Sequence, residues 1–338
     1  MRKILVSMLL NVGDVIMMTS ALDLIKQKFP QSEVGVLIRP EAEGIVKDNP
    51  LVDEVIIYPY RSGSLLHGLR SLLKSIRDGK YDFFLSLDRR SRSAWAALLC
   101  GLKKRVGPDM LFPHSSPKLW PKLLYSDVIK MSQAEYGGSL VEIFQLITRR
   151  ALNVSGSGAI TLPPISREDV QRIKGILGDG RRPLVGLCVK TNFPGKTWPK
   201  EGFVNLMTRL HQDFRPLMYI TGGPEDRPYV DELIKELAPV RALNLAGQTK
   251  LMDVRVLASI SDLCITLDNG AAHLMANSGL KNLVCILMAT TSRILADSMP
   301  QATFIQLEKV ENSYDSSRLK TETEQIFQTV ARLLKGSI

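Results

Sequence analysis

CITLDNGAAHLMANSGLKNLVCILM, residues 264–288, carries the clearest indication of the fold of this chain. The apolar run 263–267 predicts a buried strand, and residues 268–270 form a polar turn that contains glycine. A predicted helix follows the turn, and the second apolar run, 282–288, predicts another strand. Strand, turn, helix and strand make a βαβ unit of a parallel sheet, whose ligands bind at the carboxyl ends of the strands.

Two interpretations of the turn stay open on these residues alone. Asp268, Asn269 and Gly270 leave backbone N–H groups free at the start of a helix, where a phosphate can bind. His273, in the first helical turn, would then lie beside the anion. Alternatively, Asp268 or Asn269 only caps the helix, and His273 is a polar surface residue.

The length of the chain, 338 residues, predicts two domains, because one hydrophobic core seldom serves so many residues. Strands and helices alternate over 3–152 and again over 184–288, which is typical of two doubly wound parallel sheets. Residues 108–135, rich in proline, predict an irregular segment. We expect an α/β protein of GT-B type, with two Rossmann-like domains facing across a cleft, although two-domain dehydrogenases share the pattern.

The expected domains are 1–160 and 161–318, because a Gly/Ser stretch and a Pro-Pro pair fall between the two alternating halves. Residues 319–338 predict an amphipathic helix that packs back on the N-terminal domain.

The net charge of +10 is concentrated in residues 61–130, which hold fourteen Lys and Arg against five Asp and Glu. Aromatic residues are few, and no nucleic-acid-binding motif accompanies the charge, so we expect no nucleic-acid partner. The basic region favours contact with an anionic substrate or membrane surface, or else is a solvated face.

Four single cysteines, without a C-x-x-C pair, are typical of reduced core residues in a cytoplasmic protein. The apolar run 3–10 is short and broken by Ser7, so it predicts a first strand rather than a signal peptide. No stretch is long and apolar enough to span a bilayer.

Asp14 lies where the first strand meets the first helix. It either caps that helix or points into the cleft as a general base. A dinucleotide-binding loop would need G-x-G-x-x-G here, and Gly13 stands alone, which argues against a nicotinamide enzyme.

The loop 190–199 carries groups suited to a diphosphate. Thr191 and Asn192 offer hydroxyl and amide groups, and Lys196 is a point charge that neutralises phosphates. The alternative is an exposed basic turn anchored by Trp198.

Glu225 follows the next predicted strand, where acidic residues of nucleotide folds accept hydrogen bonds from ribose hydroxyls. Its alternative role is to cap the next helix. Serine-hydrolase, P-loop and H-E-x-x-H motifs are missing from the sequence, and its four histidines show no metal-ligand spacing, so we expect no catalytic metal.

Taken together, these motifs resemble those of the bacterial ADP-heptose:lipopolysaccharide heptosyltransferases, glycosyltransferase family 9. The matching segments are Gly13-Asp14 with the helix after it, Pro50–Val55, Lys196-Thr-Trp-Pro199 and Asp268-Asn-Gly-Ala-Ala-His273. The similarity covers nearly the full chain in the family's order. Asn269 stands where the family usually has Thr or Ser, and Ser7 where a basic residue is common.

The resemblance implies an inverting transferase that moves a heptose from ADP-heptose to the inner core of lipopolysaccharide, with neither metal nor cofactor. Asp14 would deprotonate the acceptor hydroxyl. Glu225 would hold the ribose, and the backbone near Thr249 would meet the adenine. The donor-binding residues implied are Thr191, Asn192, Lys196, Glu225, Thr249, Asp268, Asn269, Gly270 and His273.

The same resemblance gives the basic region a role in acceptor binding. Arg61, Arg89, Arg90 and Arg92 are expected to meet the phosphates and carboxylates of a Kdo–lipid A acceptor. The enzyme is then expected in the cytoplasm, with peripheral contact at the inner face of the cytoplasmic membrane.

Three alternatives remain. The chain could transfer a sugar from a different nucleotide, interconvert free nucleotide sugars as an epimerase, or bind nucleotide sugars without catalysis. The retained Asp14 counts against the last of these.

Overall fold

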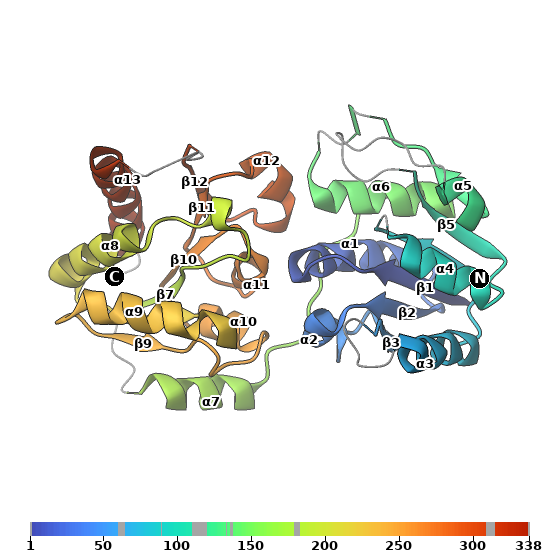
Figure 1. The fold of residues 1–338 in the computed structure, drawn as a ribbon, viewed down its shortest axis with the longest axis horizontal. Coiled ribbons are helices and arrows are strands. Elements are labelled where there is room, and N and C mark those ends of the chain that lie inside the picture. The colour runs from blue at the N-terminus through green and yellow to red at the C-terminus, as the bar shows by residue number, and fades with distance from the viewer. Residues whose placement is uncertain are drawn as a thin grey trace. The chain divides into compact units, whose positions relative to one another are not determined.

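The structure of the protein is a computed structural model that describes residues 2–59, 65–88, 90–109, 120–132, 134–135, 138–178, 183–308 and 315–336. The chain divides into two compact units, Met1–Pro164 and Ile165–Ile338. Figure 1 labels elements of both units where there is room.

The first unit is built on one parallel sheet of six strands. They lie in the order β3-β2-β1-β4-β5-β6, so the direction of winding reverses between β1 and β4. The strands are β1 (Lys3–Met8), β2 (Glu33–Ile38), β3 (Glu54–Ile57), β4 (Phe83–Ser86), β5 (Lys104–Pro108) and β6 (Asp127–Ile129). Because β1 is central, its side chains from Ile4 to Met8 are fully buried.

Helices cover both faces of this sheet. On one face α1 packs against α2 and α6, and on the other α4 packs against α3 and α5. The helices are α1 (Val12–Lys28), α2 (Glu43–Val46), α3 (Leu65–Asp78), α4 (Ser91–Leu99), α5 (Trp120–Leu124) and α6 (Leu140–Leu152), with the short 3₁₀ helix η1 (Pro40–Ala42) before α2.

The second unit repeats the plan. Its sheet has six parallel strands in the order β12-β11-β10-β7-β8-β9, with the reversal between β7 and β10. The strands are β7 (Leu184–Cys188), β8 (Leu217–Thr221), β9 (Ala242–Asn244), β10 (Leu263–Leu267), β11 (Leu283–Leu287) and β12 (Ala302–Gln306).

One face of the second sheet carries α8, which packs against α9 and α13, and the other carries α10, which packs against α7 and α11. The helices are α7 (Arg167–Leu177), α8 (Lys200–Phe214), α9 (Arg227–Leu237), α10 (Asp253–Ser259), α11 (Gly270–Ala276), α12 (Ser292–Leu295) and α13 (Ser316–Lys335), with 3₁₀ helices η3 (Pro194–Lys196), η4 (Pro224–Asp226) and η5 (Ala296–Ser298).

The predicted fold class, two Rossmann-like units with doubly wound parallel sheets, is confirmed. The structure adds elements that the sequence did not predict: α5 and β6 lie inside the stretch expected to be irregular, and α12 and β12 follow β11. In addition, α1 begins at Val12, so Asp14 lies inside its first turn.

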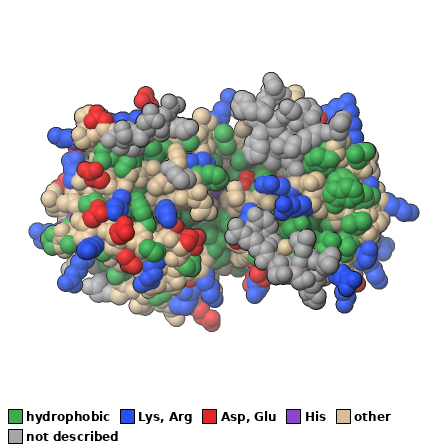
Figure 2. All heavy atoms as spheres, viewed as in Figure 1, with side chains coloured by type: hydrophobic (Ala, Val, Ile, Leu, Met, Phe, Trp, Pro, Cys, Tyr) green, Lys and Arg blue, Asp and Glu red, His purple; other side chains and the backbone are tan. Residues whose placement is uncertain are grey.

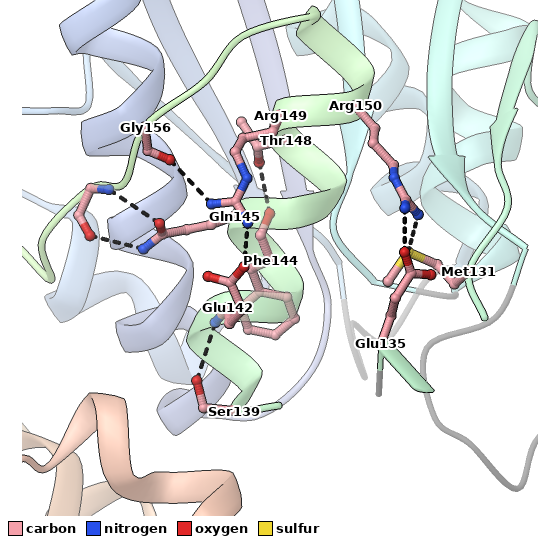
Figure 3. Close-up of polar contacts among 11 residues, drawn as sticks. Met131, Glu135, Ser139, Glu142, Phe144, Gln145, Thr148, Arg149, Arg150 and Gly156 are labelled. Atoms are coloured by element: carbon pink, nitrogen blue, oxygen red, sulfur yellow. Dashed lines mark hydrogen bonds and ion pairs between the residues drawn. The ribbon is translucent and has the colours of Figure 1, made fainter. Parts of the chain in front are cut away.

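The segment after α6 remains attached to the first unit. Gln145 exchanges two hydrogen bonds with the backbone of Gly158: its Nε2 donates to the carbonyl (2.8 Å), and its Oε1 accepts from the N–H (3.2 Å). Arg149 donates to the carbonyl of Gly156 (3.1 Å), as Figure 3 shows. These contacts hold residues 156–158 against α6, and the first unit ends after Pro164, a few residues beyond the expected boundary at 160.

The final helix, α13, packs against α8 within the second unit. Ile326 and Val330 share a buried cluster with Phe203 and Leu206 of α8. The sequence predicts that the C-terminal helix packs back on the N-terminal domain, and that contact stays a prediction.

Each sheet therefore has one switch point, β1/β4 in the first unit and β7/β10 in the second. Ligands of doubly wound sheets bind outside the carboxyl ends of the strands at this point, where the connections diverge to opposite faces. The candidate site residues are located relative to these two points.

Candidate functional site

Two connections leave the switch point of the second unit side by side. β7 and β10 are paired neighbours, with Thr266 opposite Cys188 at their carboxyl ends. The β7–α8 loop, residues 189–199, and the β10–α11 turn, residues 268–269, start from these ends. Most of the predicted donor-binding residues lie on these two connections.

Lys196 and Asp268 join the two connections through an ion pair. The ammonium Nζ of Lys196 lies 2.5 Å from Oδ2 of Asp268. The hydroxyl of Thr290, in the loop after β11, donates to the same carboxylate oxygen. Asp268 is thus held from two sides, and its side chain is only 10% exposed, against 30% for Lys196. Since an ammonium has three donors, Lys196 can keep this partner and still bind an anion.

Thr191 and Asn192 differ in how far they are available to a ligand. The Thr191 hydroxyl donates to the carbonyl of Phe193 (2.7 Å) and accepts from the N–H of the same residue (3.1 Å). Its side chain is nearly buried, so it shapes the loop from inside. Asn192 is exposed at the loop surface.

Asn269 braces the two connections against each other. Its Oδ1 accepts from the N–H of Ala272 (3.1 Å) and caps α11, while its Nδ2 donates to the carbonyl of Lys190 (3.1 Å) and lies 3.2 Å from the sulfur of Cys188. Because an amide has two hydrogens to donate, these contacts occupy its donors. Gly270, the first residue of α11, is partly exposed beside it.

His273 is buried on α11 with an exposed fraction of 3%, which differs from the surface histidine that the capping interpretation predicts. Its Nδ1 has no hydrogen-bond partner among the described residues. Burial lowers the pKa of His273 to about 4, while the Asp268 carboxylate raises it and the Lys196 ammonium lowers it further. The imidazole is therefore neutral at neutral pH.

The β8–α9 connection brings acidic groups to the same edge of the sheet. Glu225 is exposed on η4. Asp226 accepts from the N–H of Gly223 (3.0 Å) and pairs with Lys190 (3.3 Å). Lys190 is a second cation of the β7–α8 loop that the sequence analysis did not single out, although its place two residues after β7 was a usable signal.

Thr249 lies farther along the same edge, after β9. It is half-buried, and its hydroxyl donates to the carbonyl of Leu245 (3.4 Å). The adenine contact assigned to its backbone stays a prediction.

Trp198 anchors the β7–α8 loop to the core of the second unit. Its ring is fully buried and meets Phe203 edge-on, with centroids 5.0 Å apart. The indole N–H donates to Glu322 of α13 (3.0 Å). The structure therefore explains the Trp of the K-T-W-P motif by packing, and Lys196, two residues earlier, is held near Asp268 by this anchor.

The switch point of the first unit carries carboxylates. Asp14 is half-buried in the first turn of α1, and its Oδ2 accepts from the N–H of Asn11 (3.0 Å). It therefore has a capping contact, and its predicted role as a base stays a prediction.

Asp88, two residues beyond β4, is a buried carboxylate that the sequence analysis overlooked. Its Oδ1 accepts from the N–H of Arg90 (2.6 Å), and its Oδ2 accepts from the N–H of Leu9, directly after β1. Burial raises the pKa of Asp88 to about 7, the two backbone N–H groups and the Arg90 charge oppose that rise, and the charge of Asp14 adds to it. Asp88 therefore braces the loop that leads to Asp14.

The predicted acceptor-binding arginines are only partly described. Arg61 and Arg89 lie outside the described residues. Arg90 and Arg92 are exposed at the start of α4, directly after Asp88. These two guanidinium groups thus lie on the connection that leaves β4 at the switch point.

The described residues hold neither a candidate metal cluster nor a candidate membrane span. No group of three or more His, Cys, Asp and Glu residues that could hold a metal ion occurs among them. Within the same part of the chain, no helix has the length and apolar character needed to cross a membrane.

Comparisons with known proteins agree with the observed fold. Lipopolysaccharide heptosyltransferase 2 of Escherichia coli is 24% identical over 280 residues, covering 78% of this chain and 77% of that protein. The solved structure of E. coli ADP-heptose lps heptosyltransferase II gives a TM-score of 0.80 at 20% identity, over 99% of both chains. A glycosyl transferase family 9 structure from Veillonella parvula gives 0.81 at 19% identity, over 99% of this chain and 98% of that one.

The family model agrees with these relatives. Residues 69–324 match the model described as glycosyltransferase family 9 (heptosyltransferase). The chain belongs to glycosyltransferase family 9.

Proposed function

We propose that this protein transfers a heptose from ADP-heptose to the inner core of lipopolysaccharide, with inversion at the anomeric carbon and without a metal ion. The second unit binds the donor, and the first unit binds the acceptor and carries the base. The observation that supports this most is the Lys196–Asp268 pair at the switch point of the second unit, in a chain of family 9.

Donor binding rests on the cations of the β7–α8 loop. Lys196 neutralises the diphosphate while Asp268 keeps its ammonium in place. Neutral His273, with an unpartnered ring nitrogen, offers a hydrogen bond without adding charge. The loop around the phosphates is shaped by Thr191, Asn192 and the turn at Asn269 and Gly270. Glu225 binds the ribose, and the backbone near Thr249 binds the adenine.

Transfer is a single displacement. The acceptor hydroxyl oxygen attacks the anomeric carbon, the bond from that carbon to the diphosphate oxygen breaks, and ADP leaves with the electron pair. The hydroxyl proton moves to the carboxylate of Asp14. Lys196 stabilises the charge that develops on the leaving ADP, which is the work that a metal ion does in other transferases.

Acceptor binding rests on the arginines of the first unit. Arg90 and Arg92, exposed beside Asp88, suit the phosphates and carboxylates of a Kdo–lipid A acceptor, together with Arg61 and Arg89. Because such an acceptor is anchored in a lipid bilayer, the enzyme works in the cytoplasm, at the inner face of the cytoplasmic membrane.

A donor panel tests the proposal. Release of the matching nucleoside diphosphate (ADP, UDP or GDP) is measured with ADP-heptose and with other ADP-, UDP- and GDP-sugars, each with a heptose-free core acceptor and with EDTA present. We expect turnover with ADP-heptose and with none of the other nucleotide sugars. Turnover with another nucleotide sugar would replace the donor assignment, interconversion of the free nucleotide sugar would indicate an epimerase, and binding without turnover would indicate a non-catalytic protein.

A further inference from the structure

Large hydrophobic side chains are exposed on two neighbouring helices of the first unit. Trp95 and Leu99 on α4 are each 51% exposed, and Leu123 on α5 is 76% exposed. Figure 2 shows hydrophobic side chains gathered over α4 and α5, which pack against each other. We call these three residues the α4–α5 apolar surface. Exposed tryptophan and leucine side chains that gather in one place mark an interaction site.

The helical register places this surface on the outer side of α4. Trp95 and Leu99 are four residues apart and share a face, whereas Ala94 and Ala97 are fully buried in the core. An ordinary surface helix carries polar residues on its outer face. On α4 the outer face carries Trp95 and Leu99, which are larger than the buried Ala94 and Ala97. Packing within the unit therefore does not explain why these two large side chains are exposed.

The surroundings of the surface are cationic. Residues 90–108 contain five Lys and Arg and neither Asp nor Glu. Arg105 is used inside the unit, where its Nε donates to the carbonyl of Leu124 (2.7 Å), and Lys104 pairs with Asp127 (2.5 Å). Lys103 and Lys122 are exposed next to α4 and on α5.

This combination fits a lipid surface better than a protein partner. Tryptophan and leucine insert at the boundary between headgroups and acyl chains, while lysines bind anionic headgroups. A stable protein interface needs about 20–30 residues from each side, far more than this surface offers. An anionic bilayer is the partner whose charge and polarity match both features.

We propose that the α4–α5 apolar surface docks the first unit on an anionic lipid bilayer, with Lys103 and Lys122 binding the headgroups. This inference rests on the proposed function, since it gives the enzyme a way to reach an acceptor that is embedded in a membrane. It names the docking surface and its lipid partner, and it involves none of the donor-binding residues.

The test is co-sedimentation of the full chain with vesicles, either of phosphatidylcholine alone or mixed with phosphatidylglycerol. The variants are Trp95→Gln with Leu123→Gln, and Lys103→Glu with Lys122→Glu. We expect the wild type to bind the anionic vesicles only. In either double variant, the affinity for these vesicles should fall by roughly tenfold or more. The matched control is Ile176→Gln with Lys174→Glu, which changes an exposed apolar residue and an exposed lysine on α7 of the second unit and should leave binding unchanged.

Three results would overturn the proposal: no binding of the wild type to anionic vesicles, equal binding by the variants, or a wild-type dimer that the apolar variant makes monomeric. Turnover of ADP-heptose with a delipidated, water-soluble core acceptor separates this inference from the proposed function. The apolar and lysine variants should keep that turnover and lose it only with an acceptor in vesicles. If the wild type lacks turnover with the soluble acceptor, the proposed function fails while the vesicle result stands.

Discussion

The two switch points are braced at the same place by side chains of opposite hydrogen-bonding character. Asp88 lies two residues after β4, and Asn269 lies two residues after β10, the corresponding strand of the second sheet. The carboxylate of Asp88 accepts the N–H of Leu9 after β1, whereas the amide of Asn269 donates to the carbonyl of Lys190 after β7.

The two braces give the two switch points different charges. In the first unit the brace is a second carboxyl group near Asp14, and its pKa is raised by burial and, to a smaller extent, by the charge of Asp14. In the second unit the brace is neutral, so the pair of Lys196 with Asp268 and the second lysine of the loop set the charge. Under the proposed function, the first switch point takes the proton of the acceptor and the second holds the diphosphate of the donor.

The largest expected effect comes from Asp14→Asn. Asparagine keeps an oxygen that can accept the N–H of Asn11, so the first turn of α1 is preserved. It cannot take a proton, so kcat should fall by roughly 10²- to 10⁴-fold. ADP affinity, measured by calorimetry, should stay unchanged. Near-normal turnover in this variant would remove the contrast between the two switch points.

The second prediction is that a rise in pH changes the stability of the two units in opposite directions. The pKa of Asp88 is raised to about 7, so its contribution to stability is present at low pH and is lost as pH rises from about 4 through 7. The pKa of His273 is lowered to about 4, so its contribution is present above about pH 6.5 and is lost as pH falls towards 4. These pKa shifts correspond to contributions to the free energy of unfolding of at most roughly 4 kcal/mol for Asp88 and roughly 3 kcal/mol for His273.

Hydrogen exchange, read separately in β1 and β10 and corrected for intrinsic rates, measures this contrast. Raising the pH from 4 to 7 should lower the protection of the first unit relative to that of the second. Asp88→Asn and His273→Gln should each flatten the response of its own unit only. A response of the same sign in both units would contradict the assignment of these two groups.

The third prediction concerns Lys196→Ala. Loss of a charge-assisted contact should weaken ADP binding roughly ten- to a hundredfold. The control is Lys200→Ala, which removes a lysine of α8 that pairs with Glu236 (2.6 Å) and should leave ADP affinity unchanged. Equal affinities for ADP in the two variants would remove Lys196 from the donor site.

The smallest effect is expected for Asn269→Ser. A serine still caps α11 but loses the contacts to Lys190 and Cys188, each a neutral interaction of about 1 kcal/mol. ADP affinity should fall by less than about tenfold as the β7–α8 loop loosens. Asn269→Ala, which also removes the cap, should lower the melting temperature further; an unchanged affinity in both variants would show that the brace is dispensable.

The strand ends were predictable from the sequence, because buried apolar runs bounded by polar turns define them. Residues 263–267 were predicted with their observed bounds. Elements without such runs were missed: β6 has three residues, none fully buried, and β12 is an edge strand with only Ile305 buried. α5 is a single short turn that contains Pro121.

The candidate site was predictable as a set of loops and not as a set of contacts. Carboxyl ends of parallel strands share one sheet edge, so Lys196 and Asp268 could be expected near each other. The braces could not be expected, because Asp88 and Leu9 are 79 residues apart, and Trp198 and Glu322 are 124 apart. Asp88 did carry a signal, namely a carboxylate that follows a buried strand within two residues, as Asp268 follows β10.

The most direct test of the account is the configuration of the product formed from ADP-heptose in the presence of EDTA. Coupling constants of the anomeric proton, measured by NMR on the isolated product, give that configuration. A single displacement with Asp14 as base predicts one new glycosidic bond, inverted relative to the donor. Retention of configuration, or a strict requirement for a metal ion, would contradict the roles assigned here to Asp14 and Lys196.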